Sequence, residues 1–301
     1  MGRASLAWRP WFVAVVACGA VACRADIGDR GAAGGYNGGG SFGSGGIPGF
    51  TQTTGDFTPS PAQKGGWKLG PQAVADAGTG ILDTPSCSTI LGVVRDFKRE
   101  HPDFESFTGL SPTLNLVKRT LGTDKKPVYN ADATTILPKT SGKFYFDQWY
   151  RNTTVNVPYY LYLYLVPDGN VFTFQSDGFF PLDWAGWGNE GRSRNHNFDF
   201  TTEVHTEFTY KGNETFRFSG DDDLWVFINW TLAIDLGGPH SATAQEVTLD
   251  DAAAAAFQLV RGKVYPLDLF HAERHEDESN FQVETNIQFV RCGIIVDKPP
   301  G

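Results

Sequence analysis

Three consecutive carboxylates, Asp221, Asp222 and Asp223, stand immediately before an apolar run at residues 224–228 (LWVFI). Adjacent carboxylates repel one another, so such a turn is costly unless a cation neutralises it. Calcium suits the position because it accepts many oxygen ligands in irregular geometry. The acids do not alternate with other residues as the ligands of an EF-hand loop do, which excludes that type of site. The residues alone also fit a solvated acidic turn, and this alternative stays open.

A second group of reactive side chains alternates along the chain at His271, Glu273 and His275. In a strand this spacing places all three on one face. The glutamate does not directly follow the first histidine, so the run is not a zinc-protease motif. A hydrogen-bonded network beside the acidic turn is the favoured interpretation, and a transition-metal site is the alternative. We expect His240 in a turn at the same rim.

A glycine-rich loop carries Trp184 and Trp187. Aromatic faces stack on sugar rings, so these side chains are candidates for a glycan platform, with packing inside the loop as the favoured alternative. The sequence contains no phosphate-binding Gly-Lys-Ser/Thr loop. Nothing in the spacing of Asp183 and Glu203 selects glycoside hydrolysis. We therefore expect a binding protein and no enzyme.

The charge of the 301-residue chain is unevenly distributed. The net charge is −9, but the first 46 residues hold four arginines against two aspartates, which leaves −11 on the remainder. An acidic domain repels nucleic acid and anionic membrane surfaces, so we expect no nucleic-acid partner. Cations and neutral ligands are the natural candidates.

Short apolar runs rich in Val, Ile, Phe, Tyr and Thr recur between residues 143 and 290, separated by turn sequences such as PDGN. Many short strands at this spacing are typical of an all-β protein, here an antiparallel β-barrel or sandwich. We expect strands at 159–166, 171–175, 203–210, 215–219, 224–229, 264–270 and 281–289. One or two short helices are expected, at 90–99 and at 250–258, the second with an aspartate cap.

The N-terminal segment has the pattern of an export signal, which we place at residues 1–23. Two arginines precede an apolar run at 11–22 that is shorter than a membrane-spanning helix. The run ends in the sequence AVAC, which resembles a bacterial lipobox with Cys23 as the lipidation candidate. Cleavage after a small residue such as Ala22 is the alternative. We expect an exported protein, anchored at the cell surface or outer membrane or released outside the cell, with membrane contact only through the N-terminal lipid.

A Gly/Pro-rich stretch at residues 24–66 follows the signal. It has too little apolar surface to offset its conformational entropy, so we expect a disordered linker. The β domain is expected over residues 80–295. Cys87 and Cys292 lie near its two ends, and in an oxidising compartment they most simply form one disulfide. Two unrelated buried thiols are the alternative.

An ordered series of motifs resembles the fibro-slime domain signature. The longest pieces are 218–229 (FSGDDDLWVFIN) and 232–240 (LAIDLGGPH), and the others lie at 90–97, 180–183, 196–203, 272–275 and 279–281. The resemblance covers roughly residues 85–293. Fibro-slime domains are related to the protective-antigen-type (PA14-like) β-barrel lectin superfamily, so the resemblance implies that fold.

In sugar-binding members of that superfamily, two consecutive aspartates joined by a cis peptide bond hold calcium, with an asparagine and a backbone carbonyl from a later loop. The resemblance places this pair at Asp221 and Asp222, with Asp223 and Asn280 as secondary ligands. The rim expected around the ion consists of His240, Glu273, His275, Asp277, Trp184 and Trp187.

The combined expectation is an exported, surface-anchored, calcium-dependent carbohydrate-binding module of adhesin or lectin type. Its partner would be a glycan or polysaccharide on a cell surface or in a matrix. Two alternatives stay open. One is a structural surface or extracellular-matrix protein with the same fold and no sugar binding, and the other is an accessory domain of polysaccharide degradation.

Overall fold

The computed structural model describes residues 53–55, 63–73, 87–191 and 194–296, all within the compact unit Gly45–Gly301. The predicted signal peptide with Cys23, and most of the predicted linker, lie outside these residues. Among the described residues no helix is long and apolar enough to cross a membrane. The strands are β1 (Thr53–Gly55), β2 (Gly66–Gln72), β3 (Thr89–Phe97), β4 (Asn156–Tyr164), β5 (Val166–Asp168), β6 (Val171–Ser176), β7 (Phe200–Thr209), β8 (Thr215–Gly220), β9 (Asp223–Ile228), β10 (Thr231–Leu236), β11 (Thr243–Thr248), β12 (Val264–Glu273), β13 (Phe281–Thr285) and β14 (Phe289–Arg291).

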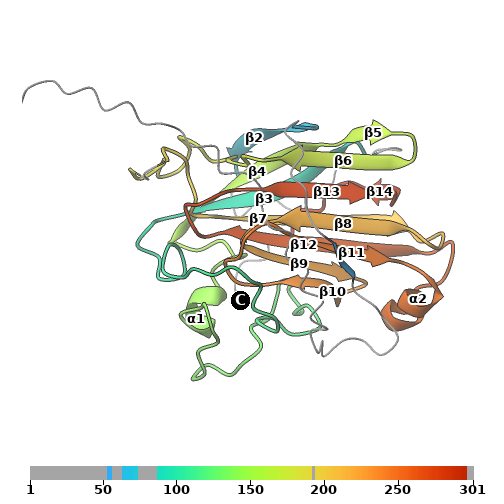
Figure 1. Cartoon of the computed structure of the whole chain (residues 1–301), viewed down its shortest axis with the longest axis horizontal. Helices are drawn as coiled ribbons and strands as arrows, with labels where there is room; N and C mark the ends of the chain where they lie inside the picture. The colour runs from blue at the N-terminus through green and yellow to red at the C-terminus, as the bar shows by residue number, and fades with distance from the viewer. Residues whose placement is uncertain (1–52, 56–62, 74–86, 192–193, 297–301) are drawn as a thin grey trace, which may run out of the picture. The chain divides into compact units, whose positions relative to one another are not determined.

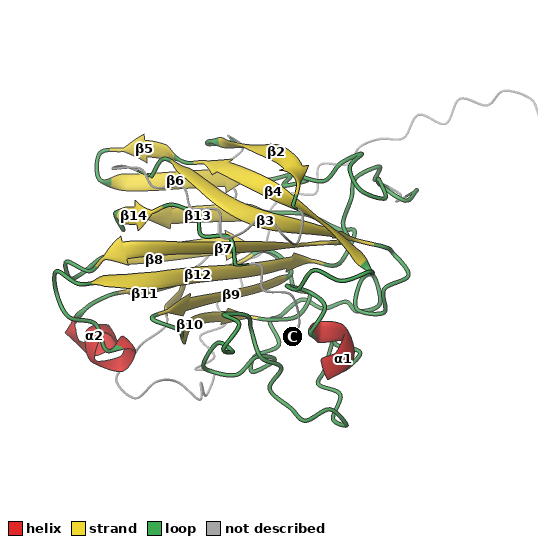
Figure 2. Ribbon diagram, turned by 180° about the vertical axis from the view of Figure 1, so that it is seen from behind, coloured by secondary structure: helices red, strands yellow, loops and turns green. Residues whose placement is uncertain are grey.

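These strands form two stacked antiparallel sheets, which confirms the predicted all-β fold (Figure 1). One sheet has the order β1-β11-β8-β13-β6-β5, and the other has the order β10-β9-β12-β7-β3-β4-β2, with β14 paired to β7. The two helices, α1 (Lys143–Phe146) and α2 (Asp251–Phe257), lie at opposite ends of the strands (Figure 2). Most neighbours in the sheets are far apart in sequence, so loops from distant parts of the chain meet at the sheet ends.

Strand β9 is apolar from Leu224 to Ile228, and both of its faces are buried. Leu224, Val226 and Ile228 point into the main core between the two sheets. Trp225 and Phe227 point to the other side, into a second cluster rich in aromatic residues. Residues 98–155, which connect β3 to β4, supply most of that second cluster. This connection therefore covers the outer face of the sheet and anchors itself there.

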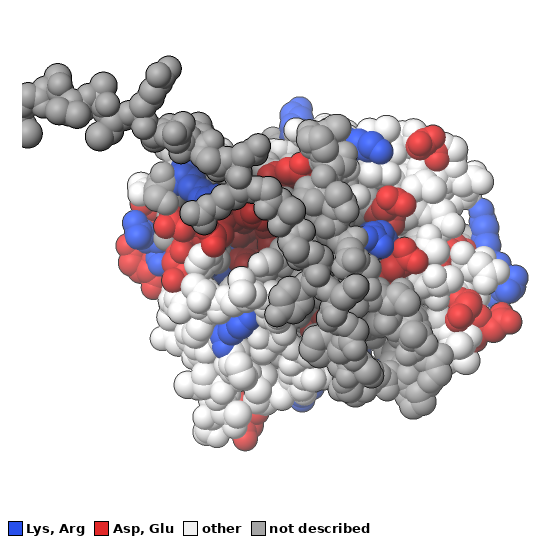
Figure 3. Space-filling view, in the orientation of Figure 1, with Lys and Arg blue, Asp and Glu red and all other residues white. Residues whose placement is uncertain are grey.

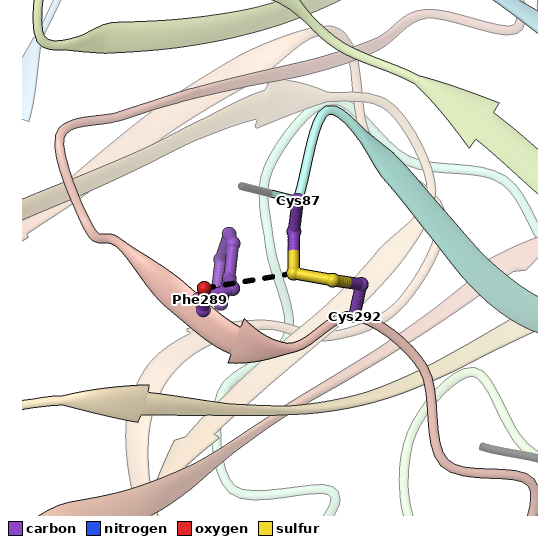
Figure 4. The surroundings of a disulfide bond; sticks show 3 residues. All are labelled: Cys87, Phe289 and Cys292. Carbon is purple, nitrogen blue, oxygen red and sulfur yellow. Dashed lines mark hydrogen bonds between the residues drawn. A yellow bond between two sulfur atoms is a disulfide. The ribbon is translucent and has the colours of Figure 1, made fainter. Parts of the chain in front are cut away.

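The disulfide predicted between Cys87 and Cys292 is present, with 5.4 Å between the two Cα atoms (Figure 4). Cys87 lies just before β3, and Cys292 follows β14. The backbone N–H of Leu91 donates to the carbonyl of Cys292 over 2.8 Å. Phe289 packs beside the bridge in the main core. The bridge thus joins the two ends of the predicted domain inside apolar surroundings.

The helix predicted at residues 90–99 is wrong, because this segment is strand β3. β3 lies between β4 and β7, and both of its neighbours bond to its backbone, so the sheet overrides the local pattern. The helix predicted at 250–258 is confirmed as α2, whose cap Asp250 accepts from the N–H of Ala253 over 2.9 Å. Strands β1 and β2 also belong to the sheets, although they precede the expected start of the domain at residue 80.

Candidate functional site

The aspartate triplet lies at the junction of two strands of different sheets. β8 ends at Gly220, β9 begins at Asp223, and Asp221 and Asp222 form the connection. All three aspartates are buried. Gly220 permits the close packing of this junction, because a Cβ atom there would lie 2.5 Å from the carbonyl oxygen of Asn280. Asp222 adopts the left-handed backbone conformation, with φ of 54°, which turns the chain sharply between the sheets.

Asp221 is held by Asn280 from the loop between β12 and β13. The backbone N–H of Asn280 donates to Oδ1 of Asp221 over 2.6 Å, and its Nδ2 donates to Oδ2 over 2.7 Å. The same Nδ2 also donates to Glu278 over 3.1 Å. Burial raises the pKa of Asp221 to about 7, although these hydrogen bonds favour its charged form. Asn280 therefore orients this carboxylate.

Asp222 and Glu273 form a buried pair of acids beside Asp221. Oδ2 of Asp222 accepts from the backbone N–H of Arg274 over 2.6 Å. Burial, reinforced by the charge of Asp221, raises the pKa of Asp222 to about 8. Burial also raises the pKa of Glu273 well above its usual value, and the charges of Asp222 and Asp221 add to this effect. Among the described residues, neither Glu273 oxygen has a hydrogen-bond donor in good geometry.

Asp223 has a different role from its two neighbours. Its Oδ2 faces the guanidinium of Arg274, with Nε at 2.7 Å and Nη2 at 2.6 Å, and its Oδ1 accepts from the N–H of Gly238. Nη1 of Arg274 donates to the carbonyl oxygens of Asp103 and Lys139. Asp223, expected as a secondary calcium ligand, is thus held in an internal ion pair and does not line the adjoining pocket.

Among the described residues, no basic side chain forms an ion pair with the carboxyl groups of Asp221, Asp222 or Glu273. Arg274 is already paired with Asp223, and Lys139, whose charge also acts on Asp222, donates to two backbone carbonyl oxygens. Buried carboxylates without a partner either retain protons or attract a cation. This imbalance is the main electrostatic property of the site.

A pocket of about 610 Å³ opens directly beside these acids. It is lined by residues of five loops, which are Thr108, Gly109, Leu110, Arg194, Asp221, Asp222, Pro239, His240, Ser241, Ala242, His275, Asp277 and Glu278. Acidic side chains gather at the left end of the face in Figure 3, the end at which β12 finishes and β13 begins in Figure 1. The predicted calcium pair and three of the predicted rim residues therefore meet in one cavity.

The three rim residues brought into the pocket are His240, His275 and Asp277. His240 is buried, its ring nitrogens contact the carbonyl oxygens of Ser241 and Leu236, and burial lowers its pKa. His275 and Asp277 are more exposed, and Nδ1 of His275 lies 3.9 Å from Oδ2 of Asp277. Both belong to the loop that also supplies Asn280.

The predicted tryptophans lie outside the pocket lining. Trp184 is 73% exposed, while the Trp187 ring lies 5.3 Å from the ammonium group of Lys98. Their loop is fixed from below by Asp96, which accepts from the N–H of Trp187 over 2.6 Å and from the side chain of Asn197 over 2.7 Å. Burial raises the pKa of Asp96 to about 7. Trp184 and Trp187 are therefore held in place outside the pocket.

His271 and Glu273 share one face of β12, as predicted, but His275 lies beyond the strand. The His271 ring is fully buried against Phe179, Phe200 and Phe281. Burial lowers its pKa to about 3, so it stays neutral. The predicted network of His271, Glu273 and His275 is therefore not formed, because aromatic rings enclose His271 and His275 lies past the end of β12.

The oxygen donors at the pocket fit a hard cation. The carboxyl groups of Asp221 and Asp222 line the cavity, and calcium prefers such oxygen ligands. The described residues contain no preformed cluster of three or more His, Cys, Asp or Glu suited to a metal. They also contain no cis peptide bond, so the Asp221–Asp222 bond is trans, unlike the cis bond implied by the resemblance.

Sequence reasoning missed the groups that organise the site. The motif at residues 272–275 contains Arg274 but does not indicate its partner, and Lys139, Arg194 and Leu110 have no local signal in the sequence. The backbone N–H of Gly238, which donates to Asp223, likewise cannot be predicted from the residue type. All of these reach the site through tertiary contacts.

The domain is thus an antiparallel β-sandwich with an acidic pocket formed by loops at one end of its strands. Residues 185–300 match the family model described as PA14 domain. The superfamily implied by the motif series is confirmed.

Relatives among curated proteins come from Dictyostelium discoideum. Protein psiR is 36% identical over 217 residues, which cover 64% of this chain and 21% of that protein. Protein psiH is 35% identical over 245 residues, covering 72% of this chain and 33% of that protein. The chain thus spans a third or less of the length of these two relatives. Among solved structures, the PA14 domain of MpAFP antifreeze protein aligns over 73% of this chain and 98% of that chain, with 9% identity and a TM-score of 0.28.

Proposed function

We propose that this chain is an exported, non-enzymatic, calcium-dependent carbohydrate-binding module. The observation that carries the proposal is the position of Asp221 and Asp222, two buried carboxyls that form no ion pair with a described basic residue, at the wall of a pocket of about 610 Å³. Calcium would supply the missing charge. It would also offer its remaining coordination positions to neighbouring hydroxyl groups of a glycan.

The surrounding residues would position the ligands of the ion. Asn280 holds both oxygens of Asp221, and the N–H of Arg274 holds one oxygen of Asp222. Glu273 is a further buried oxygen-bearing group beside them and does not line the pocket. This arrangement pre-organises two carboxylates, which lowers the entropic cost of binding a cation.

Export is supported by the disulfide between Cys87 and Cys292, because disulfides persist mainly in oxidising compartments. Lipidation at Cys23 would anchor the module to a membrane by its N-terminus. The glycan would lie on a cell surface or in a matrix, where weak single-site binding gains strength through multivalency.

Thermal unfolding in the presence of calcium tests the metal. We expect calcium to raise the Tm of the wild type and Asp222→Asn to abolish the shift. Asp251→Asn is the control, since its side chain is 94% exposed at the start of α2, away from the pocket residues. An unchanged Tm at saturating calcium contradicts the metal site.

A glycan array with calcium or with a chelator tests the ligand. Binding that is lost with the chelator supports the module as proposed. A calcium-dependent Tm without binding to any glycan would instead favour a structural surface or matrix protein. Turnover of a polysaccharide by the purified chain would overturn the non-enzymatic assignment.

A further inference from the structure

The connection between β3 and β4 forms one wall of the pocket. This wall consists of Thr108, Gly109 and Leu110, which line the same cavity as the aspartate junction although they are more than 100 residues away from it in the sequence. None of these residues belongs to a regular element, so their placement depends on contacts with the rest of the domain. Those contacts are specific.

Lys139 ties this wall to the loop after β10. Its Nζ donates to the carbonyl oxygen of Ser111 over 3.0 Å and to that of Pro239 over 2.7 Å. Gly109 is required for this approach, because a Cβ atom there would lie 2.2 Å from Nζ of Lys139 and 2.9 Å from the Pro239 oxygen. The N–H of Thr113 also donates to the carbonyl of Gly237. These contacts fix the wall to the loop that follows β10.

Leu110 is the large apolar side chain that this wall exposes at the pocket. It is 83% exposed, whereas most pocket residues contributed by the sheet junctions are polar. Single exposed leucines are common on protein surfaces. Here, however, the leucine lines the same cavity as Asp221 and Asp222, so a bound molecule that reaches those carboxylates meets an apolar surface as well.

The charges at the pocket select against acidic ligands. Asp277 and Glu278 line it together with the two junction aspartates, and Arg194 is already paired with Asp277 over 3.1 Å. A carboxylated sugar would meet repulsion from these acids. A neutral ligand avoids this cost.

We propose that Leu110 determines specificity for a neutral terminal sugar with a methyl edge, a 6-deoxyhexose. The inference rests on the proposed function, since hydroxyls of the sugar would contact a cation held by Asp221 and Asp222. The methyl group at C5 then packs on Leu110. Burying one such group against an apolar surface favours the 6-deoxy sugar over the parent hexose by about fourfold.

The test compares methyl glycosides in matched pairs that differ only in the C6 hydroxyl, namely 6-deoxygalactose with galactose and 6-deoxyglucose with glucose. Calorimetric titration of the full chain in calcium gives the affinity ratio within each pair. We expect a ratio of about fourfold or more for at least one pair in the wild type and a ratio near one for Leu110→Ser. Ile136→Ser is the matched control, because Ile136 is 68% exposed on the same connection but does not line the pocket.

Three outcomes separate the two proposals. Equal affinity within each pair, or a preference that survives in Leu110→Ser, overturns the role of Leu110 and leaves calcium-dependent sugar binding intact. Absence of binding by every sugar overturns both. A calcium-dependent Tm shift equal to that of the wild type verifies that Leu110→Ser is folded with its cation site unchanged.

Discussion

Arg274 and Asp223 form an ion pair from which water is excluded. Nε and Nη2 of Arg274 lie 2.7 and 2.6 Å from Oδ2 of Asp223, and both side chains are fully buried. The guanidinium carbon lies 4.5 Å from the centre of the Trp149 ring, and Nη1 bonds two carbonyl groups of the β3–β4 connection. Because the backbone N–H of Arg274 also bonds Asp222, this pair links the stability of the domain to the geometry of the pocket.

Removing the positive member of this pair leaves Asp223 charged, buried and without its partner. We expect Arg274→Met to lower the free energy of unfolding by about 3–5 kcal/mol, measured by urea denaturation. Arg261→Met is the control, because the Arg261–Asp251 pair is exposed and contributes at most about 1 kcal/mol. Equal losses in the two variants would contradict the structural role of the buried pair.

The calcium-free domain is expected to lose stability as the pH rises. Burial raises the pKa values of Asp221 and Asp222 to about 7 and about 8, above the ordinary aspartate value of 3.8, so the folded state retains protons that the unfolded chain has released. The contribution of these two groups to the free energy of unfolding is therefore fully present below about pH 4. It is lost as the pH rises through their folded-state pKa values.

Calcium competes with those protons for the same oxygens. We therefore expect the calcium-induced rise in Tm to be larger at about pH 8 than at about pH 5, measured by scanning calorimetry with calcium or with a chelator. Asp222→Asn should abolish this difference. A rise in Tm that is the same at both pH values would argue against binding at these carboxylates.

The disulfide should contribute strongly to stability because it closes a long loop. Cys87 and Cys292 are 205 residues apart, for which the chain-entropy model gives about 5 kcal/mol. The double variant Cys87→Ala/Cys292→Ala should lose most of this free energy of unfolding. Urea denaturation of the wild type with and without reductant gives an independent value, and no difference between them would contradict the prediction.

A buried charged network on the outer face of the eight-stranded sheet should give a second pH dependence. Glu203 accepts from Arg95 over 2.7 Å and from Lys126, and the His205 ring joins Glu203 to Asp268. Burial by itself lowers the pKa of His205, but its hydrogen bonds to the two carboxylates raise the value above 6.5 overall. The stability from His205 is therefore fully present below about pH 6.5 and is lost as the pH rises through its folded-state pKa.

His205→Gln should remove that part of the pH dependence. The measurement is the difference between the free energies of unfolding of wild type and variant, taken at several pH values from about 6 to about 9. The difference should shrink as the pH rises. A difference that stays constant over this range would indicate that His205 does not change its protonation on unfolding.

The alternation of apolar residues was enough to predict the strand content, because burial of one strand face leaves a local pattern. It failed at β3, where residues 90–97 are apolar almost throughout. A central strand covered on both faces has no alternation, and a short apolar run of that kind resembles a helix. The alternation at His271, Glu273 and His275 likewise gave the shared strand face of the first two residues but not the aromatic enclosure of His271.

The sequence by itself determined the acidic triplet, the two cysteines, the strand-rich composition and, through an ordered set of motifs, the family. Only the tertiary structure decided which carboxylates face the pocket and which is neutralised. Asp223 and Arg274 are 51 residues apart, and Leu110, from the β3–β4 connection, lines the same pocket as Asp221. The physical reason is that burial and charge balance depend on groups that meet in space, whereas residue type and spacing report only on near neighbours in the chain.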